Sequence, residues 1–190
     1  SDPTRPVISG LDRSSIETGS SSLKMIGEIC DIHTTHPYNV FSTQGSPLTT
    51  SLPILDLPFK CRLGEDVGGI PTFVQEFGSV GYMNCSKKTE ADFYRAALST
   101  SLAHGCHGTM WWCAFDQDKL DFAPYDTFAI EQNLGIACDN ETPKPLLLKL
   151  NETANFFKAL PNLPAPEKDV TVILSNEQDE WKTAYGAYVL

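Results

Sequence analysis

The segment PTFVQEFGSVGY, Pro71 to Tyr82, joins a short apolar strand to a carboxylate and then to a glycine turn. Thr72 to Gln75 have the β-branched and aromatic residues of a strand, and a Gly-Gly pair lies shortly before them. Glu76 follows the strand directly. Since the catalytic groups of parallel barrels occupy the carboxyl ends of the strands, the segment predicts that Glu76 stands at the active edge of a parallel sheet. A helix cap or a loop salt bridge would also explain a Glu at this place.

Apolar runs of strand length also lie on either side of this segment. They are Val7 to Gly10, Met25 to Ile32 and Gly108 to Ala114. Segments with helical spacing alternate with the strands, over Leu52 to Asp66, Glu90 to His104 and Pro145 to Leu160. Thr89 is the expected N-cap of the second helix and Gly105 its stop. The alternation predicts an α/β fold with about four parallel strands and crossover helices. A closed barrel of eight such strands needs about 250 residues, so this chain can supply half of one.

The last part of the chain changes character after the third helix. Residues 162–168, NLPAPEK, form a Pro-rich linker. Residues 169–175, DVTVILS, have the pattern of a buried strand, and 176–190 that of a helix. Because a lone strand and helix cannot bury their own faces, we expect residues 169–190 to be the truncated start of a second α/β domain. The expected first domain is residues 1–161.

Composition and charge restrict the class of partner. The chain of 190 residues is 41% hydrophobic and carries a net charge of −10. Nucleic acids and anionic membrane surfaces both attract basic proteins, so neither is expected as a partner. The sequence contains no apolar run of about 18 residues, the length that predicts a transmembrane helix. A neutral ligand such as a sugar agrees with the charge.

The six cysteines form no CxxC pair, which argues against a zinc ribbon or a thioredoxin-like redox site. We expect all six to be reduced and to act as small hydrophobic residues of the core. Reduced thiols favour an intracellular, cytoplasmic protein, although the localisation stays open.

Polar and aromatic residues gather after the second predicted strand, in DIHTTHPYN, Asp31 to Asn39. His36 and Tyr38 are candidate sugar contacts. The Tyr38 hydroxyl could also donate a hydrogen bond to Glu76 and so orient its carboxylate. His33 is more simply a residue of a surface loop.

A metal-dependent hydrolase of barrel type is the competing interpretation of the histidines. His33 and His36 would need a third ligand, and none is evident in the pattern. His104 and His107 lie just before the last predicted strand, on the side of a barrel that is normally away from the active face. We therefore expect neither a metal ion nor another cofactor.

Two adjacent tryptophans lie in the last predicted strand, in GTMWWCAFDQ, Gly108 to Gln117. Because adjacent strand residues face opposite sides, one of Trp111 and Trp112 should point to the barrel mouth and the other into the helical layer. An indole can stack on the apolar face of a sugar ring, and burial of both in the core is the alternative. Asp116 follows as a further candidate sugar contact. The acidic and aromatic loop from Phe115 to about Asp139 has a length typical of functional loops.

In this order and spacing, these segments resemble the superfamily of retaining β-glycosidases built on the (β/α)8 barrel. It includes the family 5 cellulases and β-mannanases and the family 2 β-galactosidases. DPTRPVISG looks like the fifth strand with its lead-in, DIHTTHPYN like the end of the sixth, FVQEFG like the seventh and GTMWWCAFDQ like the eighth. Residues 124–150 look like the final loop and helix. The resemblance covers roughly residues 2–160, and it implies the C-terminal half of a TIM barrel.

The resemblance implies a retaining glycoside hydrolase that acts on β-linked sugars. Glu76 matches its nucleophile. His36 and Tyr38 match a substrate-binding pair after the sixth strand. Trp112, or else Trp111, matches the sugar platform. The mechanism needs a second carboxylate, about 5–5.5 Å from the first, which protonates the leaving oxygen and then activates water.

The matching acid/base glutamate is absent from this chain. In the superfamily it follows an Asn at the end of the fourth strand, whereas the Asn-Glu pairs here, at 140–141, 151–152 and 176–177, come after the eighth. We therefore expect a fragment that is inactive alone. Its partners would be an oligo- or polysaccharide and the missing N-terminal half of the barrel, or a second copy in a homodimer. A non-catalytic carbohydrate-binding or scaffold fragment is the alternative.

Overall fold

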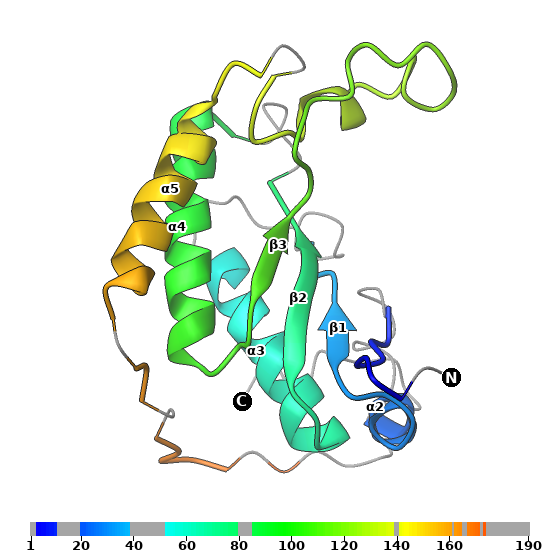
Figure 1. Ribbon diagram of the computed structural model, residues 1–190, viewed down its shortest axis with the longest axis vertical. Helices are drawn as coiled ribbons and strands as arrows, with labels where there is room; N and C mark the ends of the chain where they lie inside the picture. The colour runs from blue at the N-terminus through cyan, green and yellow to red at the C-terminus, as the bar shows by residue number, and fades with distance from the viewer. Residues whose placement is uncertain are drawn as a thin grey trace.

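Three parallel strands form the sheet of the computed structural model, in the order β1-β2-β3 (Figure 1). They are β1 (His33–Thr35), β2 (Thr72–Phe77) and β3 (Thr109–Trp111), and a helix joins each strand to the next. The structure describes residues 3–10, 20–38, 52–79, 85–138, 141–160, 162–164, 167–171 and 173. The predicted α/β class with parallel strands is confirmed.

The strand predicted over Met25 to Ile32 is wrong. Its first residues belong to helix α2 (Ser20–Gly27), and strand β1 begins only at His33. Leu23 is fully buried while Met25 is 59% exposed, so the apolar residues of this segment divide between the two faces of a helix.

The strand predicted over Val7 to Gly10 is also absent as a strand. A single parallel bridge joins Ile8 to Ile32, and the N–H of Ser9 donates to the carbonyl oxygen of Ile32 at 3.1 Å. This segment therefore lies beside the entry to β1, where the prediction placed it, but in less regular form than expected.

A bulge interrupts the pairing of β2 with β3. Val74 is opposite Thr109 and Phe77 is opposite Trp111, so β2 contains one residue more than β3 between the two pairs. Val74 and Phe77 are both fully buried in the core despite their odd spacing. Because side chains alternate along a regular strand, the extra residue frees Glu76 to point away from that core.

Helices α3 (Leu52–Gly68), α4 (Lys87–Ala103) and α5 (Pro145–Lys158) lie on one side of the sheet (Figure 1). All three confirm predicted helices, with shifted ends, and α3 continues through Pro58. Gly105 has a φ of 87° just beyond α4, in the left-handed region that ends helices, as predicted. The buried core consists of Leu57, Cys61, Val74, Phe77, Phe93, Tyr94, Ala97, Cys106 and Leu146.

The N-cap of α4 is Ser86 and not the predicted Thr89. The Ser86 hydroxyl accepts a hydrogen bond from the N–H of Thr89 at 3.1 Å. Replacing Ser86 with Ala should lower the free energy of unfolding by about 1 kcal/mol, because this N–H loses its acceptor. Urea denaturation would measure the difference against Ser99→Ala, an exposed position in the middle of the same helix. Equal stability of the two variants would contradict the assignment of the cap.

The segment after α5 gives no support to the predicted buried strand. Of residues 169–175, the structure describes 169–171 and 173, which have no regular secondary structure. Val170 and Ile173 are exposed there. The helix predicted over 176–190 lies outside the described residues, and the second domain stays a prediction. Among the residues that the structure describes, none of the helices combines the length and hydropathy that crossing a membrane requires.

The six cysteines are free thiols that differ in burial. Cys61 and Cys106 are buried, and Cys106 belongs to the turn between α4 and β3. Cys85 is partly buried and packs against the core, whereas Cys30, Cys113 and Cys138 are partly buried and outside it. The expectation that all six lie in the core is wrong for these three.

Candidate active site

Glu76, Tyr38 and His36 meet at the carboxyl ends of β1 and β2. The Tyr38 hydroxyl donates a hydrogen bond of 2.8 Å to Glu76 Oε1, the contact that the sequence predicted. His36 Nδ1 lies 3.8 Å from Glu76 Oε2, and its Nε2 lies 3.2 Å from Gln75 Oε1. Gln75 and Glu76 are adjacent and yet both reach His36, which the bulge in β2 makes possible.

The Tyr38 phenol is a permanent donor to this carboxylate. Burial raises the pKa of Tyr38 well above its usual range, and the hydrogen bond to Glu76 and the charges of Glu76 and Glu131 raise it further. The phenol therefore stays protonated at neutral pH. A donor held on one oxygen orients the carboxylate, which is useful to a group that must attack from one direction.

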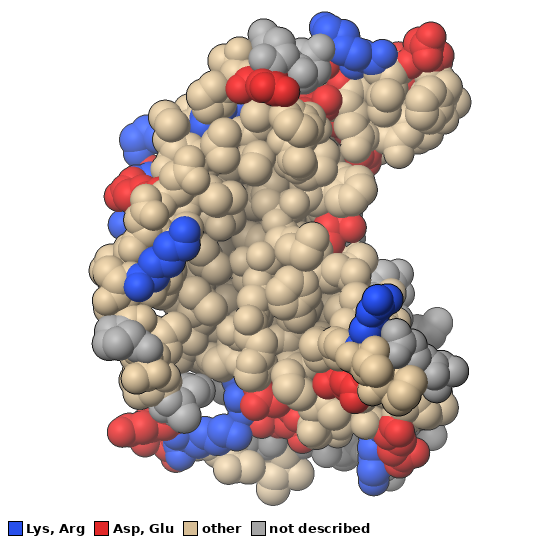
Figure 2. Space-filling model, in the orientation of Figure 1, with Lys and Arg blue, Asp and Glu red and all other residues tan. Residues whose placement is uncertain are grey.

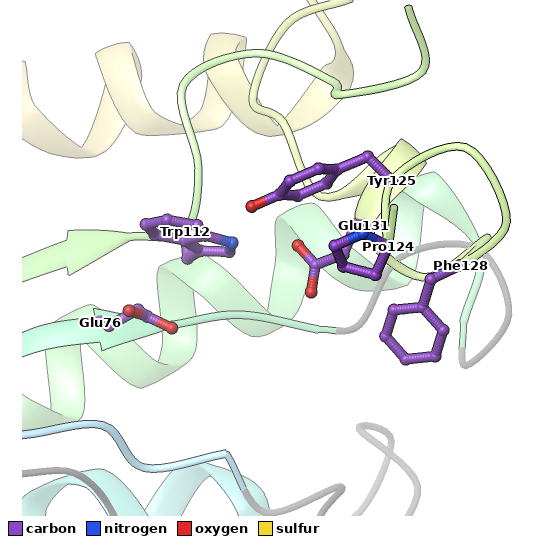
Figure 3. Close-up of a pocket in the computed structure, with 6 residues that line it drawn as sticks. All are labelled: Glu76, Trp112, Pro124, Tyr125, Phe128 and Glu131. Carbon is purple, nitrogen blue, oxygen red and sulfur yellow. The ribbon is translucent and has the colours of Figure 1, made fainter. Parts of the chain in front are cut away.

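A pocket of about 480 Å³ contains Glu76 in its wall (Figure 3). Its lining residues come from the strand ends and from the loop between β3 and α5; they are Glu76, Trp112, Pro124, Tyr125, Phe128 and Glu131. The volume falls in the range of small-molecule sites. Aromatic rings combined with a few polar groups are the usual lining of a site for a sugar ring, which has apolar faces and polar edges.

The two tryptophans separate onto opposite sides, as strand geometry predicted. The Trp111 ring centroid lies 5.1 Å from that of Phe77 and 5.8 Å from that of Tyr94, and its Nε1 donates to the carbonyl oxygen of Leu134 at 3.0 Å. Trp112 is 36% exposed and lines the pocket. Trp112 is thus placed to meet a ligand, and Trp111 belongs to the core.

Asp116 is engaged inside the protein instead of lining the pocket. Its carboxylate forms an ion pair with Lys144, and the two side chains are only 7% and 6% exposed. The same oxygen accepts a hydrogen bond from the N–H of Gly135 at 3.0 Å. This geometry does not support the predicted sugar contact at Asp116, because its oxygen is already satisfied within the fold.

The histidines do not assemble at one place. Within the described ranges, no group of three His, Cys, Asp or Glu could hold a metal ion. His33 is buried, with Nε2 at 3.1 Å from the carbonyl oxygen of Leu23, so the expectation of a surface loop residue is wrong. His104 caps the end of α4 and His107 precedes β3, at the opposite end of the sheet from Glu76.

The lining residues Tyr125, Phe128 and Glu131 were not predicted as site residues from the sequence. The length and the acidic, aromatic composition of their loop indicated a function, but the loop has no periodic pattern from which the direction of a side chain can be predicted. Its only regular element within the described residues is the single 3₁₀ turn η3 (Glu131–Asn133).

The surface around the pocket carries little positive charge. Figure 2 shows that Lys and Arg lie toward the edge of this face and that its centre is largely uncharged. The same view shows the surface hollowed beneath the projecting β3–α5 loop. Such a surface suits a neutral ligand better than an anionic one.

Comparison with known proteins found similar solved structures. No protein-family model matches the sequence, and no curated protein matches it. The chain is similar to the exo-β-1,4-mannosidase Op5Man5 from Opitutaceae bacterium strain TAV5, with 25% identity and a TM-score of 0.68 over 82% of this chain. It shares its fold with a GH5_18 protein from Streptomyces cattleya in complex with GlcNAc, at 17% identity and a TM-score of 0.77 over 95% of the chain. A β-D-glucuronidase from Dictyoglomus thermophilum is similar at 16% identity and a TM-score of 0.61 over 84%.

The chain spans only part of each of these structures, namely 29%, 45% and 27% of their chains. This partial coverage is consistent with part of a barrel. The neighbours are glycoside hydrolases, and the likeness is consistent with a relationship to the superfamily of retaining β-glycosidases that the motifs resemble.

Proposed function

We propose that this chain is the C-terminal half of the barrel of a retaining glycoside hydrolase that acts on β-linked sugars, with Glu76 as the nucleophile. One observation carries the proposal: Glu76 is the penultimate residue of a bulged parallel strand, accepts a hydrogen bond from Tyr38, and lines the same pocket as Trp112. A carboxylate with a fixed donor beside an open aromatic platform has the chemistry that attack on a sugar requires. The similarity to solved glycoside hydrolases supports the same assignment.

The proposed reaction has two displacements at the anomeric carbon. In the first, an oxygen of Glu76 bonds to this carbon while its bond to the leaving oxygen breaks, and a second carboxylic acid protonates the leaving oxygen. In the second, the second residue, which is now a carboxylate, removes a proton from water. The water oxygen bonds to the anomeric carbon, and the bond between this carbon and Glu76 breaks. Two inversions retain the configuration of the sugar.

Three residues assist Glu76 in this proposal. Tyr38 is a positioning residue that donates a hydrogen bond to one carboxylate oxygen, and His36, whose Nδ1 lies 3.8 Å from the other oxygen, is a proposed sugar contact beside it. Trp112 is the platform on which the sugar ring stacks.

The second carboxylate is proposed to come from the N-terminal half of the barrel. In the described sheet, β3 pairs with β2 alone. Met110, on the face of β3 opposite Trp111, is 54% exposed, and Ile8 near β1 is 47% exposed. Exposed apolar side chains and an open strand edge are features that a covering half-barrel would bury. A second copy of the chain is the other candidate for this cover, and light scattering would detect it as a dimer.

Covalent trapping tests the proposed function. The protein is treated with a panel of 2-deoxy-2-fluoro glycosides that carry a dinitrophenolate leaving group, and any adduct is located by peptide mass spectrometry. This leaving group departs without a proton, so the acid/base residue is not needed. An adduct on Glu76 supports the proposal. Absence of an adduct, also when both halves of the barrel are present, would favour a non-catalytic sugar-binding protein.

Removal of the Tyr38 hydroxyl should slow this trapping. In Tyr38→Phe the carboxylate of Glu76 loses its orienting donor, and a hydrogen bond to a charged group is strong enough to change the labelling rate about 10- to 100-fold. Tyr94→Phe is the matched control, because Tyr94 is buried in the core and does not line the pocket. A labelling rate in Tyr38→Phe equal to that of the control would show that the contact does not serve the reaction.

A further inference from the structure

The loop between β3 and α5 builds a wall of the pocket, and it brings a second carboxylate into it. Glu131, Tyr125 and Phe128 all belong to this loop and line the pocket together with Glu76. Figure 3 shows the Glu131 carboxylate and the Tyr125 hydroxyl both directed toward the side of the pocket where Trp112 lies. Neither side chain has a role in the proposed mechanism, which leaves their function open.

The turn that carries Glu131 is held by contacts of the residues that follow it. The carbonyl oxygen of Leu134 accepts hydrogen bonds from Trp111 Nε1 at 3.0 Å and from the N–H of Cys113 at 3.1 Å. The N–H of the next residue, Gly135, donates a hydrogen bond to the buried Asp116 carboxylate. Glu131 therefore starts from backbone that is anchored to the core, as a side chain that binds a ligand selectively requires.

Contacts within the loop hold Tyr125 next to this turn. Gln132 Nε2 donates to the carbonyl oxygen of Tyr125 at 2.9 Å. The rings of Phe122 and Tyr125 pack edge to face, with centroids 5.3 Å apart. The N–H of Glu131 also bonds to the carbonyl oxygen of Phe128 at 3.1 Å. The loop thus presents one acceptor and one hydroxyl in a fixed relation.

The charge of Glu131 is not compensated within the described part of the chain. No hydrogen bond or ion pair engages its carboxylate there, and neither Lys nor Arg is among the described lining residues. The charge of Glu131 affects two neighbouring side chains. Burial raises the pKa of Cys113 to about 11, and the charge of Glu131 contributes to this rise. The same charge contributes to the raised pKa of Tyr38. An ionised carboxylate only accepts hydrogen bonds. The pocket therefore offers acceptors and negative charge to whatever enters it.

We propose that Glu131 is a specificity-determining residue, which accepts hydrogen bonds from the hydroxyl groups of a neutral sugar ring and excludes a uronic acid of the same configuration. The inference rests on the proposed function in that it takes the pocket as a sugar site. A neutral pyranose brings several O–H donors to satisfy the open acceptor, whereas a uronate brings a third negative charge to a pocket that already holds Glu76 and Glu131. Among the solved neighbours, one is named a mannosidase and another a glucuronidase, so this choice is one that similarity of fold does not decide.

Matched pairs of sugars test the proposal. The dissociation constants of methyl β-glycosides and of the corresponding methyl β-glycosiduronates are measured by calorimetry, in the gluco, galacto and manno series. In the best-bound series, the wild-type chain should bind the neutral member at least about tenfold more tightly than the uronate, because like charges at close range repel. Glu131→Gln should weaken the binding of the neutral sugar severalfold. It should also narrow the gap in affinity between the neutral sugar and the uronate by about tenfold.

Two further variants separate a specific role from a general effect of charge. Asp121→Asn removes one negative charge from an exposed position of the same loop, outside the pocket lining, and should leave the gap unchanged. Tyr125→Phe, which keeps the charge, should weaken the binding of both sugars by the same factor and so leave the gap unchanged. The proposal is overturned if neither class of sugar binds, if the wild type binds both classes equally, or if Glu131→Gln behaves like Asp121→Asn. Selective sugar binding without any adduct on Glu76, also when both halves of the barrel are present, would leave this inference standing and would refute the proposed nucleophile.

Discussion

Glu76→Gln should lose covalent labelling by the dinitrophenyl 2-deoxy-2-fluoro glycoside that labels the wild type best, with a fall of at least about 1,000-fold in rate. The amide has nearly the shape of the carboxylate, and its oxygen can still accept the hydrogen bond from Tyr38. It lacks the negative charge and the nucleophilic oxygen that form the bond to the anomeric carbon. The loss should therefore concern reaction and leave binding and folding nearly unchanged. Intact-protein mass spectrometry over time measures the rate.

The control for this variant is Glu28→Gln, an identical substitution at an exposed position after α2. It should label at the wild-type rate. In the complete barrel the same contrast should appear as loss of steady-state hydrolysis in Glu76→Gln alone. Labelling of another residue in both the wild type and Glu76→Gln would show that the nucleophile is elsewhere, and the proposed role of the strand-end carboxylate would then be abandoned.

The parts of this fold that the sequence predicts well are those with a strong local signal. Helices α4 and α5 have apolar stripes at helical spacing and clear stops, and both are present. Strand β2 combines β-branched and aromatic residues after a Gly-Gly pair, and it too is present. In these segments local preference and tertiary packing agree, which is the condition under which a sequence pattern is informative.

The pattern of apolar residues did not locate strand β1, because the buried residues of this strand are polar; only the resemblance placed the end of a strand within Asp31 to Asn39. His33, Thr34 and Thr35 form the strand and are all fully buried, whereas the apolar run just before them supplies the end of a helix. The strand has polar partners that are distant in sequence: the hydroxyl of Ser9 accepts a hydrogen bond from the N–H of Thr34 at 2.9 Å and lies 3.3 Å from Thr34 Oγ1. Such partners have no signature within a short window.

The direction of Glu76 is a second feature that strand periodicity could not give. A regular alternation that buries Val74 would place Glu76 on the same face, in the core. The bulge reverses this by inserting one residue, and its position depends on the pairing with β3. The sequence therefore located the carboxylate at the strand end correctly, while the physical reason that it faces the pocket lies in another strand.

Asp116 is the site residue whose prediction from sequence and whose place in the structure differ most, and the difference has a measurable consequence. Asp116→Asn should lower the free energy of unfolding by about 3 kcal/mol or more, because it leaves the Lys144 ammonium buried without its counter-charge. The nearby Lys87 should increase this loss of stability, because burial and the charge of Lys144 already lower the pKa of Lys87. Asp118→Asn is the matched control. Its carboxylate is 40% exposed and lies 3.7 Å from Lys119, so the change should be within about 0.5 kcal/mol.

A double substitution distinguishes a structural ion pair from a sugar contact at Asp116. If the cost of Asp116→Asn comes from the unpaired ammonium, adding Lys144→Met should restore part of the stability, because it removes the uncompensated charge. A direct sugar contact predicts the reverse pattern, with normal stability and weakened binding in Asp116→Asn and no rescue by the second change. Chemical denaturation and sugar titration of the four proteins in the cycle separate the two cases. The first result would mean that Asp116 affects the pocket only by holding Gly135, and through it the turn that presents Glu131.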